Sequence, residues 1–258
     1  MHNNNPLGFF DSGIGGTSIW REVHALLPKE NTIFLADSIN APYGEKSKEE
    51  IVELSIKNTN LLLKLNCKAI IVACNTATTN AIKELRAKYN VPIIGIEPAI
   101  KPAAINSETN TIGILATKGT LNSELFHKTT LNYPNTNIIE QIGHGLVRLI
   151  EDGKKDSPEM MNLLESYLTP MIKANIDYLV LGCSHYPYLI QNIKKIIPAT
   201  IKIIDSGEAV AIQTKKILSN KTGLSQDLNS KQIFYTNSDP KVLRSILNNE
   251  FTVIKKDF

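Results

Sequence analysis

The chain of 258 residues is poor in the features that mark disulfide-rich, metal-binding and membrane proteins. It has three cysteines, an odd number without Cys-x-x-Cys spacing, which argues against a disulfide framework or a zinc motif and favours a reducing compartment. No apolar run approaches the roughly 20 residues of a membrane span. The segment MHNNNPLGFF lacks a basic leader before a long apolar stretch, so we expect no signal peptide and a cytoplasmic location.

Charge is nearly balanced and is spread along the chain. The 28 basic and 25 acidic residues give a net charge of +3, and the lysines occur singly or in short pairs. This pattern is typical of solvated surfaces, so we expect neither a nucleic-acid partner nor a membrane partner. With 42% hydrophobic residues the composition is that of a globular protein of one large or two smaller domains.

Short apolar runs alternate with segments of helical periodicity. Strands are expected at residues 7–10, 32–36, 69–73, 92–96, 111–116, 178–182, 201–204 and 233–235. Helices are expected at residues 49–65, 78–89, 160–173 and 208–219. Such alternation predicts right-handed crossovers and an α/β fold whose parallel sheets are covered by helices on both faces.

One sequence pattern occurs twice. KAIIVACNTATTNAIKEL at residues 68–85 and DYLVLGCSHYPYLIQNIKKI at residues 177–196 share an apolar strand, a small residue, a cysteine, two polar residues and an amphipathic helix. Each copy is followed by a strand that runs into an acid, Glu97 or Asp205, and NPLGFFDSGIGG (5–16) is echoed upstream by NTIGILATKGT (110–120).

The repeat predicts two similar, doubly wound domains related by pseudo-twofold symmetry, with the active site in the cleft between them. We expect one domain to comprise residues 1–97 and the other residues 98–206. The tail, residues 207–258, is expected to contribute a helix, a strand and a helix and to return to the first domain.

The repeated cysteines, Cys74 and Cys183, come where a strand gives way to a helix. Ligands of open α/β sheets bind beyond the carboxyl ends of the strands, so both thiols are candidates for chemistry. A helix N-terminus is expected to lower the pKa of each thiol from about 8.5 toward neutrality. Two thiols on opposite walls of a cleft suit a reaction in which a proton leaves one face of a carbon and another arrives on the opposite face.

Polar residues surround both thiols. Asp11 and Ser12 end the first strand and lead into a turn with Gly13, Gly15 and Gly16, whose backbone amides can approach an anion. Donors suited to a carboxylate or an α-amino acid flank the cysteines: Asn75, Thr76, Ser184 and His185. Asp37, before the Pro42-Tyr43-Gly44 stretch, is interpreted as part of an ordinary strand-to-helix loop, and Cys67 as a packing or surface thiol.

Four motifs together identify a family resemblance. FDSGIGG (10–16), ADSINAPYG (36–44), ACNTA (73–77) and LGCSHYP (181–187) are similar, in order and spacing, to motifs of the glutamate racemases in the cofactor-independent aspartate/glutamate racemase superfamily. The resemblance spans most of the chain. It implies a two-domain α/β isomerase that interconverts L- and D-glutamate for peptidoglycan synthesis, with glutamate as its small-molecule substrate and without pyridoxal phosphate, metal or another cofactor.

The resemblance also implies roles for individual residues. Cys74 and Cys183 match the two acid/base cysteines, with Asp11 supporting the first and His185 the second, and Glu151 in LIEDG lies where the family places a further acid. The positions that match substrate contacts are Asp11, Ser12, Pro42, Tyr43, Gly44, Asn75, Thr76, Thr117, Thr120, Ser184 and His185. Ser184 departs from the family's usual Thr, which keeps the hydroxyl and loses a methyl group.

Alternatives remain at this stage. A racemase for aspartate or another amino acid would share the paired thiols and differ only in its side-chain contacts. A two-lobed module that binds a small anion would have a similar architecture but no need for mirrored thiols. A thiol redox enzyme is disfavoured because there is no Cys-x-x-Cys pair. The sequence leaves open whether the chain forms a homodimer.

Overall fold

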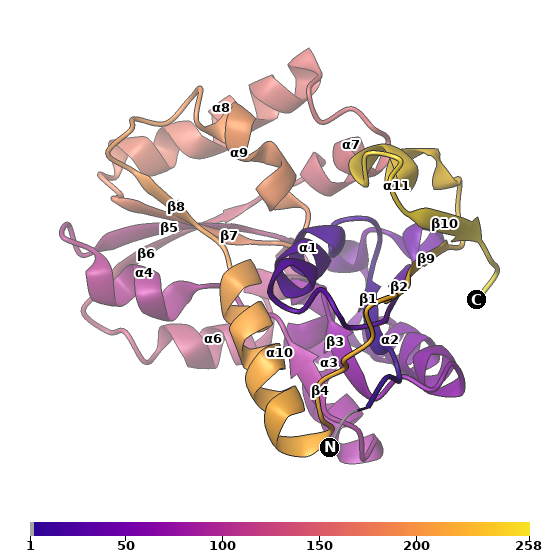
Figure 1. Ribbon diagram of the computed structural model, residues 1–258. Coiled ribbons are helices and arrows are strands. Elements are labelled where there is room, and N and C mark those ends of the chain that lie inside the picture. The colour runs from indigo at the N-terminus through magenta and orange to yellow at the C-terminus, as the bar shows by residue number, and fades with distance from the viewer. Residues whose placement is uncertain (1–2) are drawn as a thin grey trace.

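The computed structural model describes residues 3–258 and contains two parallel β-sheets flanked by helices (Figure 1). The first sheet has the strand order β10-β9-β2-β1-β3-β4 and the second has the order β6-β5-β7-β8, with every pairing parallel. The first sheet comprises β1 (Leu7–Asp11), β2 (Thr32–Ala36), β3 (Ala69–Val72), β4 (Ile93–Gly95), β9 (Gln232–Thr236) and β10 (Thr252–Lys255). The second comprises β5 (Thr111–Ala116), β6 (Asn137–Ile142), β7 (Tyr178–Gly182) and β8 (Lys202–Ile204). The predicted α/β class is therefore confirmed.

The strand order repeats between the two sheets. The segment β2-β1-β3-β4 of the first sheet has the same order as β6-β5-β7-β8 of the second. The central strands β1, β2, β3 and β7 are buried along their whole length, which explains why each is a continuous apolar run. Cys74 follows β3 and Cys183 follows β7, so the two thiols leave equivalent strands.

Helices cover both sheets. Those linked to the first sheet are α1 (Thr17–Leu26), α2 (Lys48–Lys64), α3 (Asn75–Lys88), α10 (Gly207–Lys221) and α11 (Pro240–Ile246). Those linked to the second are α4 (Ile100–Asn106), α5 (Lys118–Leu121), α6 (Glu124–Thr130), α7 (Leu146–Glu151), α8 (Pro158–Lys173) and α9 (Ile190–Ile193). Short 3-10 turns are η1 (Ser38–Asn40), η2 (Tyr43–Glu45) and η3 (Tyr186–Leu189). Figure 1 shows α8 and α9 on one side of the second sheet and α4 and α6 on the other.

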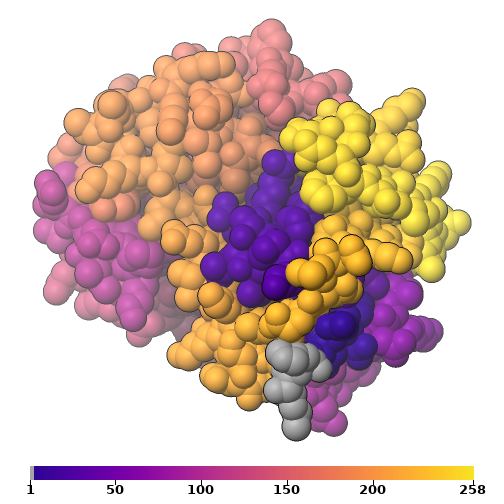
Figure 2. Space-filling model, in the orientation of Figure 1, coloured from indigo at the N-terminus to yellow at the C-terminus, as the bar shows by residue number. Residues whose placement is uncertain are grey.

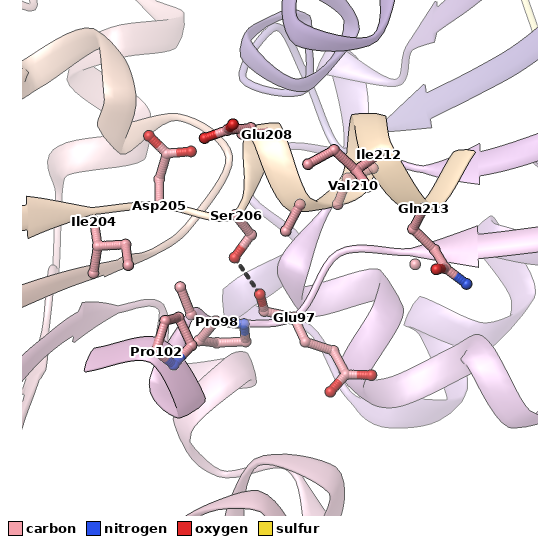
Figure 3. Close-up of a pocket in the computed structure, with 13 residues that line it drawn as sticks. Glu97, Pro98, Pro102, Ile204, Asp205, Ser206, Glu208, Val210, Ile212 and Gln213 are labelled. Carbon is pink, nitrogen blue, oxygen red and sulfur yellow. Dashed lines mark hydrogen bonds between the residues drawn. The ribbon is translucent and has the colours of Figure 1, made fainter. Parts of the chain in front are cut away.

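The chain passes between the two sheets at two adjacent crossings. The first follows β4 through Glu97, and the second follows β8 through Asp205 and Ser206 (Figure 3). The Ser206 hydroxyl donates a hydrogen bond to the backbone carbonyl of Glu97, which ties the crossings together. Both crossings and α10 line a cavity of about 570 Å³. The two acids that end the sequence repeat, Glu97 and Asp205, therefore lie at these crossings.

The tail completes the first sheet. After the second crossing α10 packs against α1, and β9 then pairs with β2. Figure 2 shows the yellow C-terminal segment against the indigo N-terminal segment. The tail has one strand more than the sequence predicted, because β10 follows α11. The exact domain bounds, 1–97 with 207–258 and 98–206, stay a prediction.

Two of the four edge strands, β6 and β10, escaped prediction, whereas the edge strands β4 and β8 were predicted. β6 borders the second sheet and β10 borders the first. Neither is buried on both faces: β6 has no fully buried residue, and β10 has only Val253 buried. Their sequences, NIIEQI and TVIK, consequently lack the long apolar run of a central strand.

No helix within residues 3–258 combines the length and the apolarity that a bilayer crossing requires. The first two residues of the segment inspected for a leader lie outside the described residues.

Candidate active site

The two repeated thiols lie at the carboxyl ends of their sheets and are almost completely covered. Cys74 is 4% exposed and Cys183 is 5% exposed, and both are free thiols. Asp11, at the end of β1, is fully buried beside them. The sequence therefore placed both cysteines and Asp11 correctly at the edge of the sheets where α/β proteins bind ligands.

Cys74 forms the N-terminal cap of α3. Its Sγ accepts a hydrogen bond from the Ala77 amide at 3.4 Å, and the Ser12 backbone also donates to it. The helix was expected to lower the pKa of this thiol, and that expectation is wrong. Burial, followed by the negative charge of Asp11, raises the pKa of Cys74 well above its ordinary value. Cys74 is therefore a protonated thiol in this arrangement.

The Asp11 carboxylate links the two halves of the molecule, one built on the first sheet and the other on the second. Its Oδ2 accepts hydrogen bonds from the Gly16 and Gly13 amides at 2.9 and 3.2 Å. Its Oδ1 accepts a hydrogen bond from the Ser184 hydroxyl at 3.1 Å, which comes from the residue after Cys183. Burial raises the pKa of Asp11, although the charge of His185 partly offsets the effect.

Cys183 stands at the start of a short relay. Its Sγ lies 3.8 Å from His185 Nδ1, and His185 Nε2 lies 2.6 Å from Glu151 Oε1. Burial alone would lower the pKa of His185. The hydrogen bonds to Cys183 and Glu151 and the charges of Asp11 and Glu151 outweigh that effect and hold the pKa well above its ordinary value. The raised pKa favours the charged imidazole, in which Nε2–H is directed at Glu151, the last residue of α7.

The glycine-rich turn after β1 makes room for this relay. A Cβ atom at Gly13 would lie 1.9 Å from Glu151 Oε1, and one at Gly15 would lie 2.2 Å from His185 Nδ1. The Ile14 amide donates to Glu151 Oε1 at 2.7 Å. The anions that the turn was expected to approach are thus the protein's own carboxylates, those of Asp11 and Glu151.

A cluster of hydroxyl groups bridges the halves near Cys74. Thr76, in the first turn of α3, lies 2.8 Å from Thr117 Oγ1 and 3.3 Å from Thr120 Oγ1, measured from its own Oγ1. Thr117 and Thr120 are 3.0 Å apart at the start of α5. Gly44 approaches the same cluster so closely that a Cβ on it would lie 2.7 Å from Thr117 Cβ. Three hydroxyl donors and a backbone loop therefore converge here.

Asn75 lies between Cys74 and this hydroxyl cluster in the sequence. It is 2% exposed, and among residues 3–258 neither polar atom of its side chain has a hydrogen-bond partner. Buried amides are nearly always paired, so an unpaired one beside a thiol points to a polar ligand that completes its hydrogen bonding.

The loop between β2 and α2 holds the remaining predicted contacts. Pro42, Gly44 and Thr117 line a cavity of about 160 Å³. Tyr43 is buried, and its hydroxyl donates to Asp37 Oδ2 at 2.6 Å, so it points into the protein. The interpretation of Asp37 as an ordinary loop residue therefore missed its hydrogen bond with Tyr43.

Three further contacts of the site were missed in the sequence. The Ser38 hydroxyl donates to Glu151 Oε2 at 3.0 Å, and the Ser18 hydroxyl donates to the backbone carbonyl of Ser184 at 2.8 Å. The Tyr188 and Thr17 hydroxyls are 2.5 Å apart. Ser38 lies two residues after the end of β2, and this position near the carboxyl end of a strand is a signal that could have been used. The contacts of α1 with the segment after β7 depend on how the halves pack, which one sequence does not reveal.

Cys67 lies apart from this chemistry. It is buried in the core, and a Cβ on Gly8 would lie 3.0 Å from its Sγ. Burial raises its pKa to about 12, so it is an inert packing thiol. Within the described part of the chain, no group of three or more His, Cys, Asp or Glu side chains is arranged to hold a metal ion.

Known proteins are similar to this chain in sequence and in fold. The model of the Asp/Glu/Hydantoin racemase family matches residues 16–214. The glutamate racemase of Ralstonia pickettii (strain 12J) is 47% identical over 207 residues, which cover 80% of this chain and 73% of that protein.

Two crystal structures are similar over nearly the whole chain. Glutamate racemase isoform RacE1 from Bacillus anthracis has a TM-score of 0.90 at 30% identity, covering 100% of this chain and 99% of that one. Glutamate racemase from Francisella tularensis subsp. tularensis SCHU S4, in complex with D-glutamate, has a TM-score of 0.86 at 28% identity, covering 99% and 97%. Sequence and fold agree, and the chain belongs to the Asp/Glu/Hydantoin racemase family.

Proposed function

We propose that this protein is a glutamate racemase that uses Cys74 and Cys183 as paired acid and base. The observation that carries the proposal is the pair of buried thiols on equivalent strands, each with its own polar partner. Asp11 accompanies Cys74, and the His185–Glu151 pair accompanies Cys183. A binding module would need no such duplicated acid/base groups.

The proposed reaction moves one proton to each face of the α-carbon in turn. With L-glutamate, the thiolate of Cys183 removes the α-proton, and the electron pair left on carbon spreads into the adjacent carboxylate. The thiol of Cys74 then donates its proton to the opposite face, which yields D-glutamate, a Cys183 thiol and a Cys74 thiolate. The reverse reaction begins from that state, so atoms and charge balance in both directions.

The partners of the thiols reset their protonation. The raised pKa of Cys74 makes it the proton donor of the resting state. We assign to Asp11 the exchange of a proton with Cys74, and to His185 the exchange with Cys183, because each lies beside its thiol.

Substrate recognition is assigned to the unpaired and shared polar groups. The Asn75 amide, the hydroxyls of Thr76, Thr117, Thr120, Ser12 and Ser184, and the loop with Pro42, Tyr43 and Gly44 would hold the carboxylates and the amino group. Donors fixed on the α-carboxylate also stabilise the charge that develops there, a contribution of about 3–4 kcal/mol for one well-placed donor. The relative in complex with D-glutamate supports glutamate over aspartate as the substrate.

The structure is closed around the thiols, so the proposal includes a movement. Glutamate is far larger than a water molecule, and Cys74 and Cys183 are only 4% and 5% exposed, so we infer that the two halves separate to admit it. The paired crossings at Glu97 and Ser206 are the connections about which this opening would occur. Supply of D-glutamate for peptidoglycan, a cytoplasmic location and assembly as a homodimer remain part of the proposal.

Incubation of the purified protein with single L-amino acids tests the function. Chiral chromatography should show D-glutamate forming from L-glutamate, with little or no D-aspartate from L-aspartate. The rate should survive exhaustive dialysis, a carbonyl-trapping reagent and a chelator. Selective turnover of aspartate would favour the alternative racemase, and binding of glutamate without turnover would favour the binding module.

A further inference from the structure

The loop between β2 and α2 has little internal support. It consists of the turns η1 and η2, held by single backbone hydrogen bonds such as Asn40 N to Asp37 O at 2.9 Å and Lys46 N to Tyr43 O at 3.1 Å. Isolated 3-10 turns of this length are weak elements. The loop nevertheless carries Pro42, Tyr43 and Gly44, so its position must be set by side chains from elsewhere.

The carboxylate of Asp37 provides part of that support. Asp37 is fully buried, and its Oδ2 accepts hydrogen bonds from the Tyr43 hydroxyl at 2.6 Å and from Asn58 Nδ2 at 3.3 Å. Its Oδ1 accepts from Asn40 Nδ2 at 2.7 Å, and Lys57 pairs with the carboxylate at 3.3 Å. Burial, together with the charge of Asp37, keeps the pKa of Tyr43 well above its ordinary value, so its phenol remains a donor.

Asn237 reaches the same carboxylate from the tail of the chain. Its Nδ2 donates to Asp37 Oδ1 at 2.5 Å, while its Oδ1 accepts a hydrogen bond from the Ile39 amide at 3.0 Å. The cause is the strand register: β9 pairs with β2 so that Thr236 is opposite Ala36. The residues that follow the two strands, Asn237 and Asp37, therefore lie side by side.

We propose that Asn237 is a positioning residue for glutamate binding, which fixes the loop containing Tyr43 and Gly44 by holding Asp37 and Ile39 at once. Asn237 does not belong to any of the four motifs, and it acts on the substrate only through the loop. The inference rests on the proposed function. It gives the tail strand β9 a role in the site in addition to its pairing in the sheet.

Two substitutions separate the two contacts. Asn237→Ala removes both, and we expect KM for glutamate to rise about tenfold with kcat changed by less than about threefold, because binding contacts are lost. Asn237→Asp keeps the oxygen that accepts from Ile39 but sets a carboxylate against Asp37. Like charges at this distance repel, so KM should rise further in Asn237→Asp than in Asn237→Ala.

Val253→Ala is the matched control for a loosened tail. Val253 is a buried residue of β10, beside Phe234 of β9, and has no polar contact with the loop. The control should lower the melting temperature at least as much as Asn237→Ala and leave KM unchanged. If KM rose equally in both variants, general loosening of the tail would explain the effect of Asn237→Ala, and the proposal would be overturned.

Hydrogen exchange separates this inference from the proposed function. In Asn237→Ala the amides of residues 38–46 should exchange faster than in the wild type, while those of β1 and β7 should not. Exchange of that loop at the wild-type rate would overturn the positioning role even if the enzyme turned over glutamate. Failure of the wild type to racemise glutamate would instead overturn the proposed function, and the exchange result would still decide the loop's support.

Discussion

His185 Nε2 lies 2.6 Å from Glu151 Oε1, and the side chains are 1% and 13% exposed. The amide of Ile14 donates to the same carboxylate oxygen, and the Ser38 hydroxyl donates to the other. Glu151 therefore connects the relay beside Cys183 to two loops of the first half. Together with Cys183 and Asp11, this carboxylate raises the pKa of the imidazole, and it also helps to hold the closed arrangement.

Replacing Glu151 by Gln should change the dependence of stability on pH. The pKa of His185 is above its ordinary value of 6.5, so the folded protein holds this proton more tightly than the unfolded chain does. The resulting stability is complete below pH 6.5 and is lost as the pH rises through the folded pKa. The wild type should thus exceed Glu151→Gln in melting temperature most at pH 6, and the gap should narrow at higher pH. Calorimetry from pH 6 upward measures this difference in melting temperature. A difference that grows with pH would contradict a charged His185–Glu151 pair.

The same variant should lose activity without losing substrate affinity. A hydrogen bond to a charged group is worth about 1.5–3 kcal/mol, which corresponds to a fall of about ten- to a hundredfold in kcat. An unchanged kcat with a raised KM would assign Glu151 to binding instead of to the relay.

Cys67 should be dispensable for catalysis. It precedes β3, at the opposite end of that strand from Cys74, and burial raises its pKa to about 12. Cys67→Ala should therefore retain near wild-type turnover and lose about 1–2 kcal/mol of stability through a small cavity. Steady-state kinetics with denaturant unfolding checks both, and a loss of turnover in folded Cys67→Ala would require a third functional thiol.

The ion pair of Lys68 with Glu30 should matter far more to stability. The two side chains are each 2% exposed, and the charged atoms are 2.7 Å apart. Lys68 also donates to the carbonyl of Gly223, and Glu30 accepts from the amide of Ser225, so the pair anchors the tail. Lys68→Met leaves a carboxylate buried alone and should cost about 3–5 kcal/mol.

A second substitution provides the control for that prediction. Adding Glu30→Leu to Lys68→Met removes the unpaired charge and should restore much of the lost stability. Chemical denaturation measures the free energy of unfolding of both variants. If Glu30→Leu lowered this free energy further instead of restoring it, the unpaired buried charge would not be the cause of the loss in Lys68→Met.

The sequence patterns predicted the strands that are buried on both faces of a sheet. β3 and β7 are covered on both sides, so each appears as an apolar run that stops at Cys74 or Cys183, and the repeat follows from comparing them. The edge strands β6 and β10 are partly solvated and carry no such signal. Ser184 and His185 directly follow Cys183 within the motif LGCSHYP, so the same pattern singled them out.

Two features of the site depend on tertiary packing and were beyond sequence patterns. The pKa of Cys74 rises because Asp11 and the surrounding core enclose it, although its place at a helix N-terminus suggested the opposite. The support of Tyr43 by Asp37 and Asn237 joins residues 200 positions apart in the chain. Such a contact becomes visible only when the register of β9 against β2 is known.

Rate constants alone cannot identify the base that serves each enantiomer. L- and D-glutamate have equal free energies, so the equilibrium constant is one and kcat/KM is the same in both directions for any variant. Only exchange of the α-proton without inversion separates the two thiols.

The most direct test of the two-base account is therefore deuterium incorporation in heavy water by Cys74→Ser and Cys183→Ser. Net racemisation should collapse in both, because each direction needs one thiol to remove the proton and the other to donate one. Cys183→Ser should slowly place deuterium in D-glutamate without inverting it, and Cys74→Ser should do so in L-glutamate. If either variant kept near wild-type racemisation, or if both labelled the same enantiomer, the assignment of opposite faces to Cys74 and Cys183 would be contradicted.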